Sequence, residues 1–143
     1  MQIQSYLFFN GNCGDVIAYY REVLGAEELF RMRFDEAPPD PQRPPMPPSM
    51  GDKVMHATLR IGQSDLMMSD GGCMTNSSAF AGFSLSLAGE DAATAERYFN
   101  ALAKDGTVKM PFQKTFWSPG FGMVTDRFGV PWMVTAPPLE KIG

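Results

Sequence analysis

The sequence is poor in the side chains that hold metals or form disulfides. It contains one histidine and two cysteines, Cys13 and Cys73, in 143 residues. The two cysteines lie far apart and form no C-x-x-C pair, so the pattern favours neither a zinc knuckle nor a redox dithiol. Both are expected to be reduced thiols.

Positive charge and long apolar runs are also scarce. The chain has 12 Lys and Arg against 16 Asp and Glu, a formal net charge of −4, and no window in which basic residues collect. Binding to nucleic acid is therefore not expected. No apolar run approaches the roughly 20 residues that span a bilayer, and residues 1–5 lack the basic region of a signal peptide. We expect no membrane partner and a cytoplasmic location.

The composition otherwise fits one globular domain. Apolar residues make up 44% of the chain and charged residues 20%, values that are ordinary for a folded domain of this length. Eleven Met and eleven Phe suit either an irregular core or an apolar pocket. Composition alone does not choose between these two uses.

The first 70 residues predict a strand, a helix and three further strands. The β-branched and aromatic segment 3–10 reads as a strand, and Asn12 is a suitable N-cap for a helix that Gly25 ends. A proline-rich loop at 35–52 interrupts the strands that follow. Those strands are expected at 27–34, 54–61 and 64–69, the last two joined by a hairpin turn at 62–63.

The same order of elements returns in residues 80–137. A strand at 83–87 precedes a helix that begins after Gly89-Glu90-Asp91 and ends at Asp105-Gly106, and strands follow at 107–115, 121–126 and 130–135. This repeat predicts an α+β fold in which residues 1–143 form one domain of two βαβββ modules, 1–70 and 80–137. Mixed sheets would curve around a cleft, with the helices outside.

Several segments resemble the PhnB-like branch of the vicinal-oxygen-chelate superfamily, which includes glyoxalase I, extradiol dioxygenases and bleomycin-resistance proteins. They are YLFFNGNC at 6–13, YY and VLG at 19–25, VMHA at 54–57, KMPF to FW at 109–117 and TDRFGVPW at 125–132. The resemblance covers nearly the whole chain and implies paired βαβββ modules and a homodimer. In the enzymes of the superfamily, the cleft holds a divalent metal on His and Glu side chains.

This sequence departs from the metal pattern that the resemblance implies. The matching positions fall at or beside Ser5, Met68 or Ser69, 82–84 and Met133, and none is His, Glu or Asp. A protein-held metal needs three or four converging donors. His56 with Asp70 would still fall short, so no metal, cofactor or catalytic residue is predicted.

Five residues are candidates for ligand contact. His56 is the chain's one imidazole and could anchor a ligand, although a hydrogen-bonded wall histidine explains it equally. Trp117, Phe121 and Trp132 could form an aromatic edge, but such residues more often fill the core. Ser69 completes the set, and pairing of Cys13 with His56 as a nucleophile has no support from spacing.

The leading hypothesis is a metal-free small-molecule-binding protein that forms a homodimer. The first alternative is a glyoxalase-like or dioxygenase-like enzyme with an unorthodox metal set or a His56 base. The second is a structural or regulatory dimer whose cleft is filled by its own side chains. Methyl transfer is not favoured, because Gly11-Asn12-Cys13-Gly14 is not a nucleotide loop and no doubly wound repeat is present to bind S-adenosylmethionine.

Overall fold

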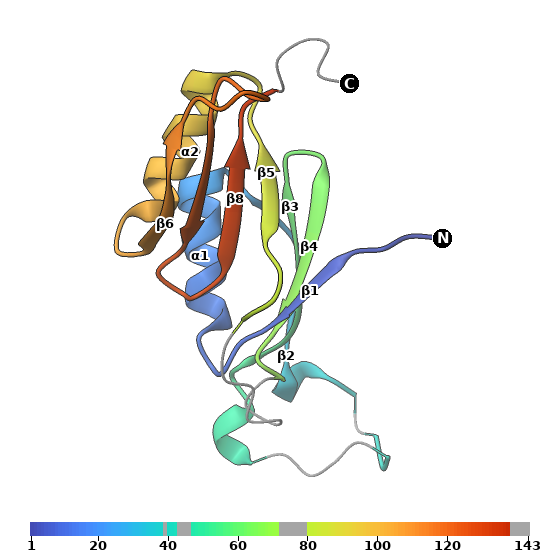
Figure 1. Ribbon diagram of the computed structural model, residues 1–143. Coiled ribbons are helices and arrows are strands. Elements are labelled where there is room, and N and C mark those ends of the chain that lie inside the picture. Colours follow the sequence, from blue (N-terminus) through green and yellow to red (C-terminus); the bar gives the residue numbers. More distant parts are fainter. Residues whose placement is uncertain (39, 43–46, 72–79, 138–143) are drawn as a thin grey trace. The chain divides into compact units, whose positions relative to one another are not determined.

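The computed structural model describes residues 1–38, 40–42, 47–71 and 80–137 (Figure 1). The chain divides into two compact units, residues 1–78 and 79–143. The described residues of each unit form one α-helix and one four-stranded sheet. The predicted order βαβββ occurs in both, so the expected α+β fold with two modules is confirmed.

The first unit has the strand order β1-β4-β3-β2. Strand β1 is parallel to β4, and the other neighbours are antiparallel. Two short 3₁₀ turns, Phe34–Glu36 and Pro48–Met50, lie between β2 and β3. The elements are β1 (Ser5–Phe8), α1 (Cys13–Leu24), β2 (Glu27–Arg33), β3 (Val54–Ile61) and β4 (Ser64–Ser69).

The second unit repeats this arrangement with the strand order β5-β8-β7-β6. Strand β5 is parallel to β8, as β1 is to β4, while β6, β7 and β8 are antiparallel neighbours. The elements are β5 (Leu85–Ala88), α2 (Ala92–Ala103), β6 (Thr107–Gln113), β7 (Phe121–Thr125) and β8 (Pro131–Thr135). Helices α1 and α2 have 12 residues each, and among the described residues no helix is long and apolar enough to cross a membrane.

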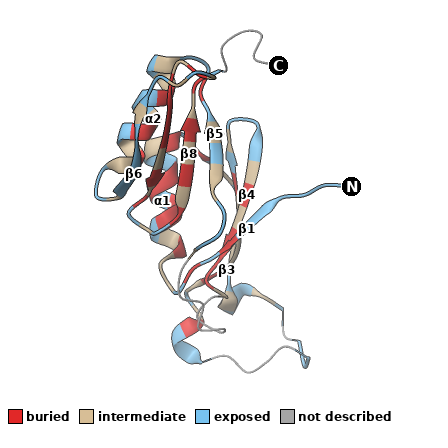
Figure 2. Ribbon diagram, viewed as in Figure 1, coloured by how far each residue is buried: buried red, intermediate tan, exposed pale blue. Residues whose placement is uncertain are grey.

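Each helix covers one face of the sheet in its own unit. Helix α1 packs on β2 and β3, where Ala57 and Leu59 are completely buried (Figure 2). Helix α2 packs on β6, β7 and β8, and a Cβ on Gly122 would lie only 2.7 Å from the Phe99 ring. The glycine therefore allows α2 to approach the sheet closely. Since side chains alternate along a strand, the residues between these positions lie on the opposite, open faces.

The helix ends differ in one respect from the prediction. Helix α1 ends at Gly25 in the left-handed conformation, φ 65°, as predicted. At its start, Asn12 holds the N-cap position, but its side chain makes no capping hydrogen bond. The amide of Cys13 donates instead to the carboxylate of Asp70, 2.9 Å away. The cap of α1 thus comes from a residue 57 positions along the chain.

The cap of α2 leads to a pH-dependent prediction. The Asp91 carboxylate accepts a hydrogen bond from the Thr94 amide, 2.7 Å away, and this bond lowers the pKa of Asp91. A lowered pKa stabilises the fold above the unfolded pKa and loses this effect as pH falls through the folded value. In urea unfolding, Asp91→Ala should therefore lower the midpoint at pH 7 more than at pH 3. Asp91→Asn, which keeps an acceptor, should lower it less; equal losses for Asp91→Ala at both pH values would contradict this account.

Candidate functional site

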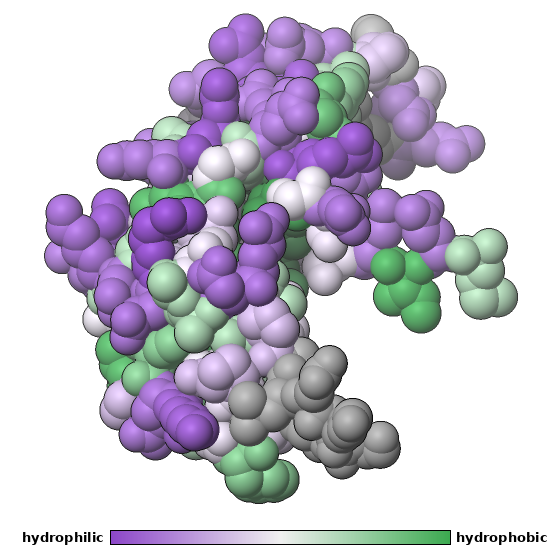
Figure 3. All heavy atoms as spheres, turned by 90° about the horizontal axis from the view of Figure 1, so that it is seen from above, coloured by the Kyte–Doolittle hydropathy of each residue, from purple (hydrophilic) through white to green (hydrophobic). Residues whose placement is uncertain are grey.

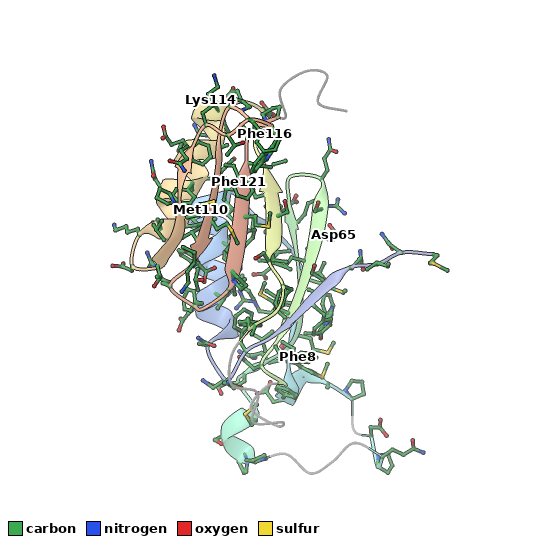
Figure 4. The ribbon with its side chains drawn as sticks, in the orientation of Figure 1. Phe8, Asp65, Met110, Lys114, Phe116 and Phe121 are labelled. Atoms are coloured by element: carbon green, nitrogen blue, oxygen red, sulfur yellow. The ribbon has the colours of Figure 1, made fainter. Side chains whose placement is uncertain are left out.

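The open face of the first sheet carries exposed aromatic side chains. In β1, Leu7 is buried toward the helix while its neighbours Tyr6 and Phe8 are 39% and 50% exposed. In β2, Phe30 pairs with Thr58 and is 46% exposed. Figure 3 shows that hydrophobic side chains reach the surface between hydrophilic ones. Phe8, labelled in Figure 4, belongs to this face.

His56 lies among these rings. Its Nδ1 is 2.9 Å from the Tyr6 hydroxyl, and its Nε2 is 3.2 Å from Thr58 Oγ1. The imidazole centroid is 5.5 Å from that of Tyr6 and 5.9 Å from that of Phe30. Both ring nitrogens are therefore engaged by hydroxyl groups on the open face, and the chain's single imidazole has an aromatic border.

Ser69 supports the same group of side chains. It is 3% exposed, its Oγ accepts a hydrogen bond from the Gly71 amide at 2.9 Å, and it bonds the Tyr6 side chain. Burial raises the pKa of Tyr6, so the phenol stays protonated at neutral pH. The structure thus brings together the predicted His56 and Ser69 through Tyr6, a residue that the sequence analysis did not select.

The open face of the second sheet carries a separate aromatic group. Phe121 pairs with Thr135 on this face, and the Trp117 ring lies 5.5 Å from the Phe121 ring. Phe116 packs edge-on to Trp117 at 4.8 Å and is itself 84% exposed (Figure 4). A turn closed by the Ser118 amide and Thr115 Oγ1, 3.1 Å apart, positions Trp117. The predicted Trp117 and Phe121 are therefore neighbours.

Trp132 lies on the helix-covered face of that sheet. It is 4% exposed and pairs with Val124, which is 1% exposed. Its Nε1 donates a hydrogen bond to Asp126 Oδ2 at 2.9 Å. The same carboxylate accepts from the amide of Val130 at 3.1 Å, within the turn that joins β7 to β8. The structure places Trp132 as a packing residue and apart from Trp117.

Asp70, considered above as a partner for His56, serves the backbone instead. Its Oδ1 accepts from the amides of Gly11 and Cys13 at 2.8 and 2.9 Å, and its Oδ2 accepts from Val54 at 3.0 Å. The side chain is 1% exposed. A carboxylate with these three donors holds the start of α1, the start of β3 and the end of β4 together.

The donor set does not fit the metal site that the superfamily resemblance implies. Among the matching positions, Ser69 Oγ is bonded to Gly71 and Met68 is fully buried. In the described part of the chain, no three His, Cys, Asp or Glu side chains gather in a way that could hold a metal ion. Cys13 is also buried, and burial raises the pKa of its thiol far above neutrality, so the thiol is a poor nucleophile. Cys73 lies outside the described residues.

The two βαβββ units define the vicinal-oxygen-chelate fold. A glyoxalase/bleomycin resistance protein/dioxygenase family enzyme from Burkholderia phytofirmans shares this fold with a TM-score of 0.61 at 14% identity, covering 92% of this chain and 96% of that chain. Residues 1–135 match the family model described as 3-demethylubiquinone-9 3-methyltransferase. The chain belongs to this PhnB-like family.

Closer relatives cover almost the whole chain. It is 42% identical over 139 residues to protein YjdN of Escherichia coli, covering 94% of each sequence. The crystal structure of protein PA1353 from Pseudomonas aeruginosa is 42% identical, with a TM-score of 0.83 and coverage of 96% of this chain and 98% of that one. The PhnB protein from Bacillus cereus is 26% identical, with a TM-score of 0.75 and coverage of 95% and 99%. The predicted resemblance is thereby confirmed.

Proposed function

We propose that this chain is a small-molecule-binding protein that holds its ligand without a metal. The proposed contact on the first unit is His56, supported by the buried Ser69, and a separate proposed contact on the second unit is Trp117, supported by the buried Phe121. Trp132 is left out because its indole is buried and bonded to Asp126.

One observation carries the proposal: the open face of the first sheet exposes aromatic rings beside polar groups. Rings on the first face border the His56 imidazole, and on the second face Phe116, Trp117 and Phe121 are in ring contact. Small-molecule sites combine apolar and aromatic walls with a few fixed polar groups. A flat ligand gains apolar contact from such rings and orientation from such hydrogen bonds.

The arrangement of donors supports binding without a metal. Both His56 nitrogens are engaged by hydroxyl groups, and the Asp70 carboxylate accepts three backbone hydrogen bonds. A metal at His56 would displace one of the hydroxyl partners and would still need further ligands. The methyltransferase activity in the family description finds no support in a fold of two βαβββ modules, because S-adenosylmethionine sites of the doubly wound type need a βα repeat.

We further propose that the protein is a cytoplasmic homodimer. Several large apolar side chains are exposed in one chain, among them Leu29 at 42%, Phe83 at 43% and Val108 at 46%. Exposed apolar groups of this size are typical of protein interfaces. Most symmetric oligomers are dimers with twofold symmetry, in which the same surface is used twice.

Native mass spectrometry of freshly isolated protein tests these proposals in one spectrum. The expected species has twice the 15.8 kDa mass of one chain, carries an organic compound and carries no stoichiometric metal. His56→Ala should leave the dimer intact and reduce the occupancy of the compound. A divalent metal bound one to each chain would contradict the proposal and favour the glyoxalase-like or dioxygenase-like alternative. Compound-free dimers that no metabolite stabilises against heat would favour a structural dimer.

A further inference from the structure

A continuous set of hydrogen bonds crosses the open face of the first sheet. It joins Ser69, Tyr6, His56 and Thr58, and we call these four residues the hydroxyl–imidazole chain. Ser69 is hydrogen-bonded to Tyr6, Tyr6 Oη lies 2.9 Å from His56 Nδ1, and His56 Nε2 lies 3.2 Å from Thr58 Oγ1. The residues come from β4, β1 and β3, which are adjacent in the sheet.

The buried end sets the direction in which these groups donate. Ser69 Oγ accepts the Gly71 amide, and the serine is 3% exposed. Its own O–H therefore needs an acceptor, because a buried hydroxyl without one loses about 1 to 3 kcal/mol. Tyr6 Oη is the acceptor that the structure offers. Ser69 donates to Tyr6.

This direction then fixes the protonation of His56. Tyr6, having accepted from Ser69, directs its own O–H to His56 Nδ1. Nδ1 is consequently the acceptor nitrogen, and the proton of the neutral ring lies on Nε2, which donates to Thr58 Oγ1. A protonated phenol is a better donor than acceptor, which favours this order over one in which Nδ1–H donates to Tyr6. Neighbouring bonds that all point the same way also strengthen one another.

The outer end of the chain is a hydroxyl donor. Thr58 Oγ1 accepts from His56, so its O–H is left to point away from the ring. Thr58 is partly exposed and has no further side-chain partner among the described residues. Unlike Ser69, it can therefore donate to solvent or to a ligand on the open face.

The surroundings of this donor define what it recognises. Phe8 and Phe30 are about half exposed and provide flat apolar contact on the same face. The Arg60 guanidinium on β3 is paired with Asp65 through contacts of 2.9 and 3.3 Å, so its charge is balanced within the sheet. The face offers a neutral donor beside aromatic rings, which suits an uncharged acceptor better than an anion.

We propose that the hydroxyl–imidazole chain makes the first sheet selective for a planar aromatic ligand with an uncharged hydrogen-bond acceptor, such as a carbonyl oxygen. This inference rests on the proposed binding function and names its ligand class. Thr58 would donate to the acceptor, and Tyr6 would act as a positioning residue through His56. Ring contacts from Phe8 and Phe30 would hold the aromatic part.

The first test is the tautomer of His56, which needs no ligand. Because the chain has one histidine, nitrogen NMR of the whole protein gives an unambiguous signal. We expect the proton on Nε2 and an unprotonated Nδ1 in the neutral ring. Tyr6→Phe should shift the population toward the other tautomer, whereas Tyr98→Phe on α2 should not. A proton on Nδ1 in the unaltered protein would reverse the chain and overturn the inference.

The second test compares three probes by NMR titration of the intact protein. Benzamide should bind more tightly than benzoate, which adds a charge, and more tightly than cyclohexanecarboxamide, which lacks the flat ring. Thr58→Val should weaken benzamide up to about tenfold, the effect of one hydrogen bond. Equal binding of benzamide and benzoate would contradict the selectivity. If the Nε2 tautomer is found but no probe binds and isolated protein carries no compound, the proposed function fails while the hydrogen-bond direction stands.

Discussion

Replacing Asp70 by alanine is expected to lower the free energy of unfolding by about 2 to 6 kcal/mol. The carboxylate accepts hydrogen bonds from the amides of Gly11, Cys13 and Val54. The Gly11 amide is partly buried and can bond to water instead, so two buried donors, the amides of Cys13 and Val54, would lose their partner. Each lost bond of this kind is worth roughly 1 to 3 kcal/mol. Since domains of this size have about 5 to 15 kcal/mol in total, a large part of the stability is at stake. Urea unfolding at constant pH measures the loss.

Two variants separate the role of Asp70 from a general effect of charge. Asp15→Ala removes an exposed carboxylate from the first turn of α1, where the helix dipole makes it worth less than about 1 kcal/mol. Asp70→Asn keeps one acceptor oxygen and should fall between the two. A loss in Asp70→Ala no larger than that in Asp15→Ala would show that the buried carboxylate does not hold these segments together.

Local sequence signals located most of the elements. Strands β3 and β4 have the predicted bounds because Gly62, with φ 60°, marks the hairpin turn between them. The sequence also locates the turn between β7 and β8, where Gly129 has φ 85°. Strand β5 begins two residues later than predicted, because its extent depends on which residues pair with β8. Hydrogen bonding between distant strands is not encoded in a short window.

The cap of α1 shows the same limit more clearly. A suitable residue, Asn12, precedes the helix, and local rules select it. The structure uses Asp70, which reaches the helix only because β4 ends beside β1. Aspartate after a strand gives no sign of such a contact. A capping partner 57 residues away can therefore be identified only once the fold is known.

Alternation along the strands found part of the candidate site. Side chains alternate along 54–61, so His56 and Thr58 share one face and Ala57 lies on the other, in agreement with the buried Ala57 and the partly exposed His56 and Thr58. Tyr6 was missed because a tyrosine in an aromatic strand is indistinguishable from a core residue by composition. Tyr6 precedes the buried Leu7 in β1, so the same alternation would have placed Tyr6 on the open face.

The two tryptophans could not be told apart by sequence, because neighbouring residues in β8 are all apolar and either face could be buried. The pairing of β8 with β7 resolves the choice, because Trp132 lies opposite the buried Val124 and Met133 lies opposite Met123. One tryptophan is therefore structural, while the other, Trp117, contacts exposed Phe116. This difference predicts effects of different size for the same substitution at the two positions.

Trp132→Phe is expected to lower the free energy of unfolding by about 2 to 4 kcal/mol, whereas Trp117→Phe should change it by less than about 1 kcal/mol. The first substitution removes part of a buried ring and the donor to Asp126 Oδ2, so a cavity arises and the carboxylate loses this hydrogen bond. Because the chain has two tryptophans, each variant keeps one fluorescent reporter for its own unfolding. In the folded state, acrylamide should quench the remaining Trp117 strongly and the remaining Trp132 weakly. Equal quenching, or equal stability of the two variants, would refute the assignment of Trp132 to the core and return it to the candidate ligand surface.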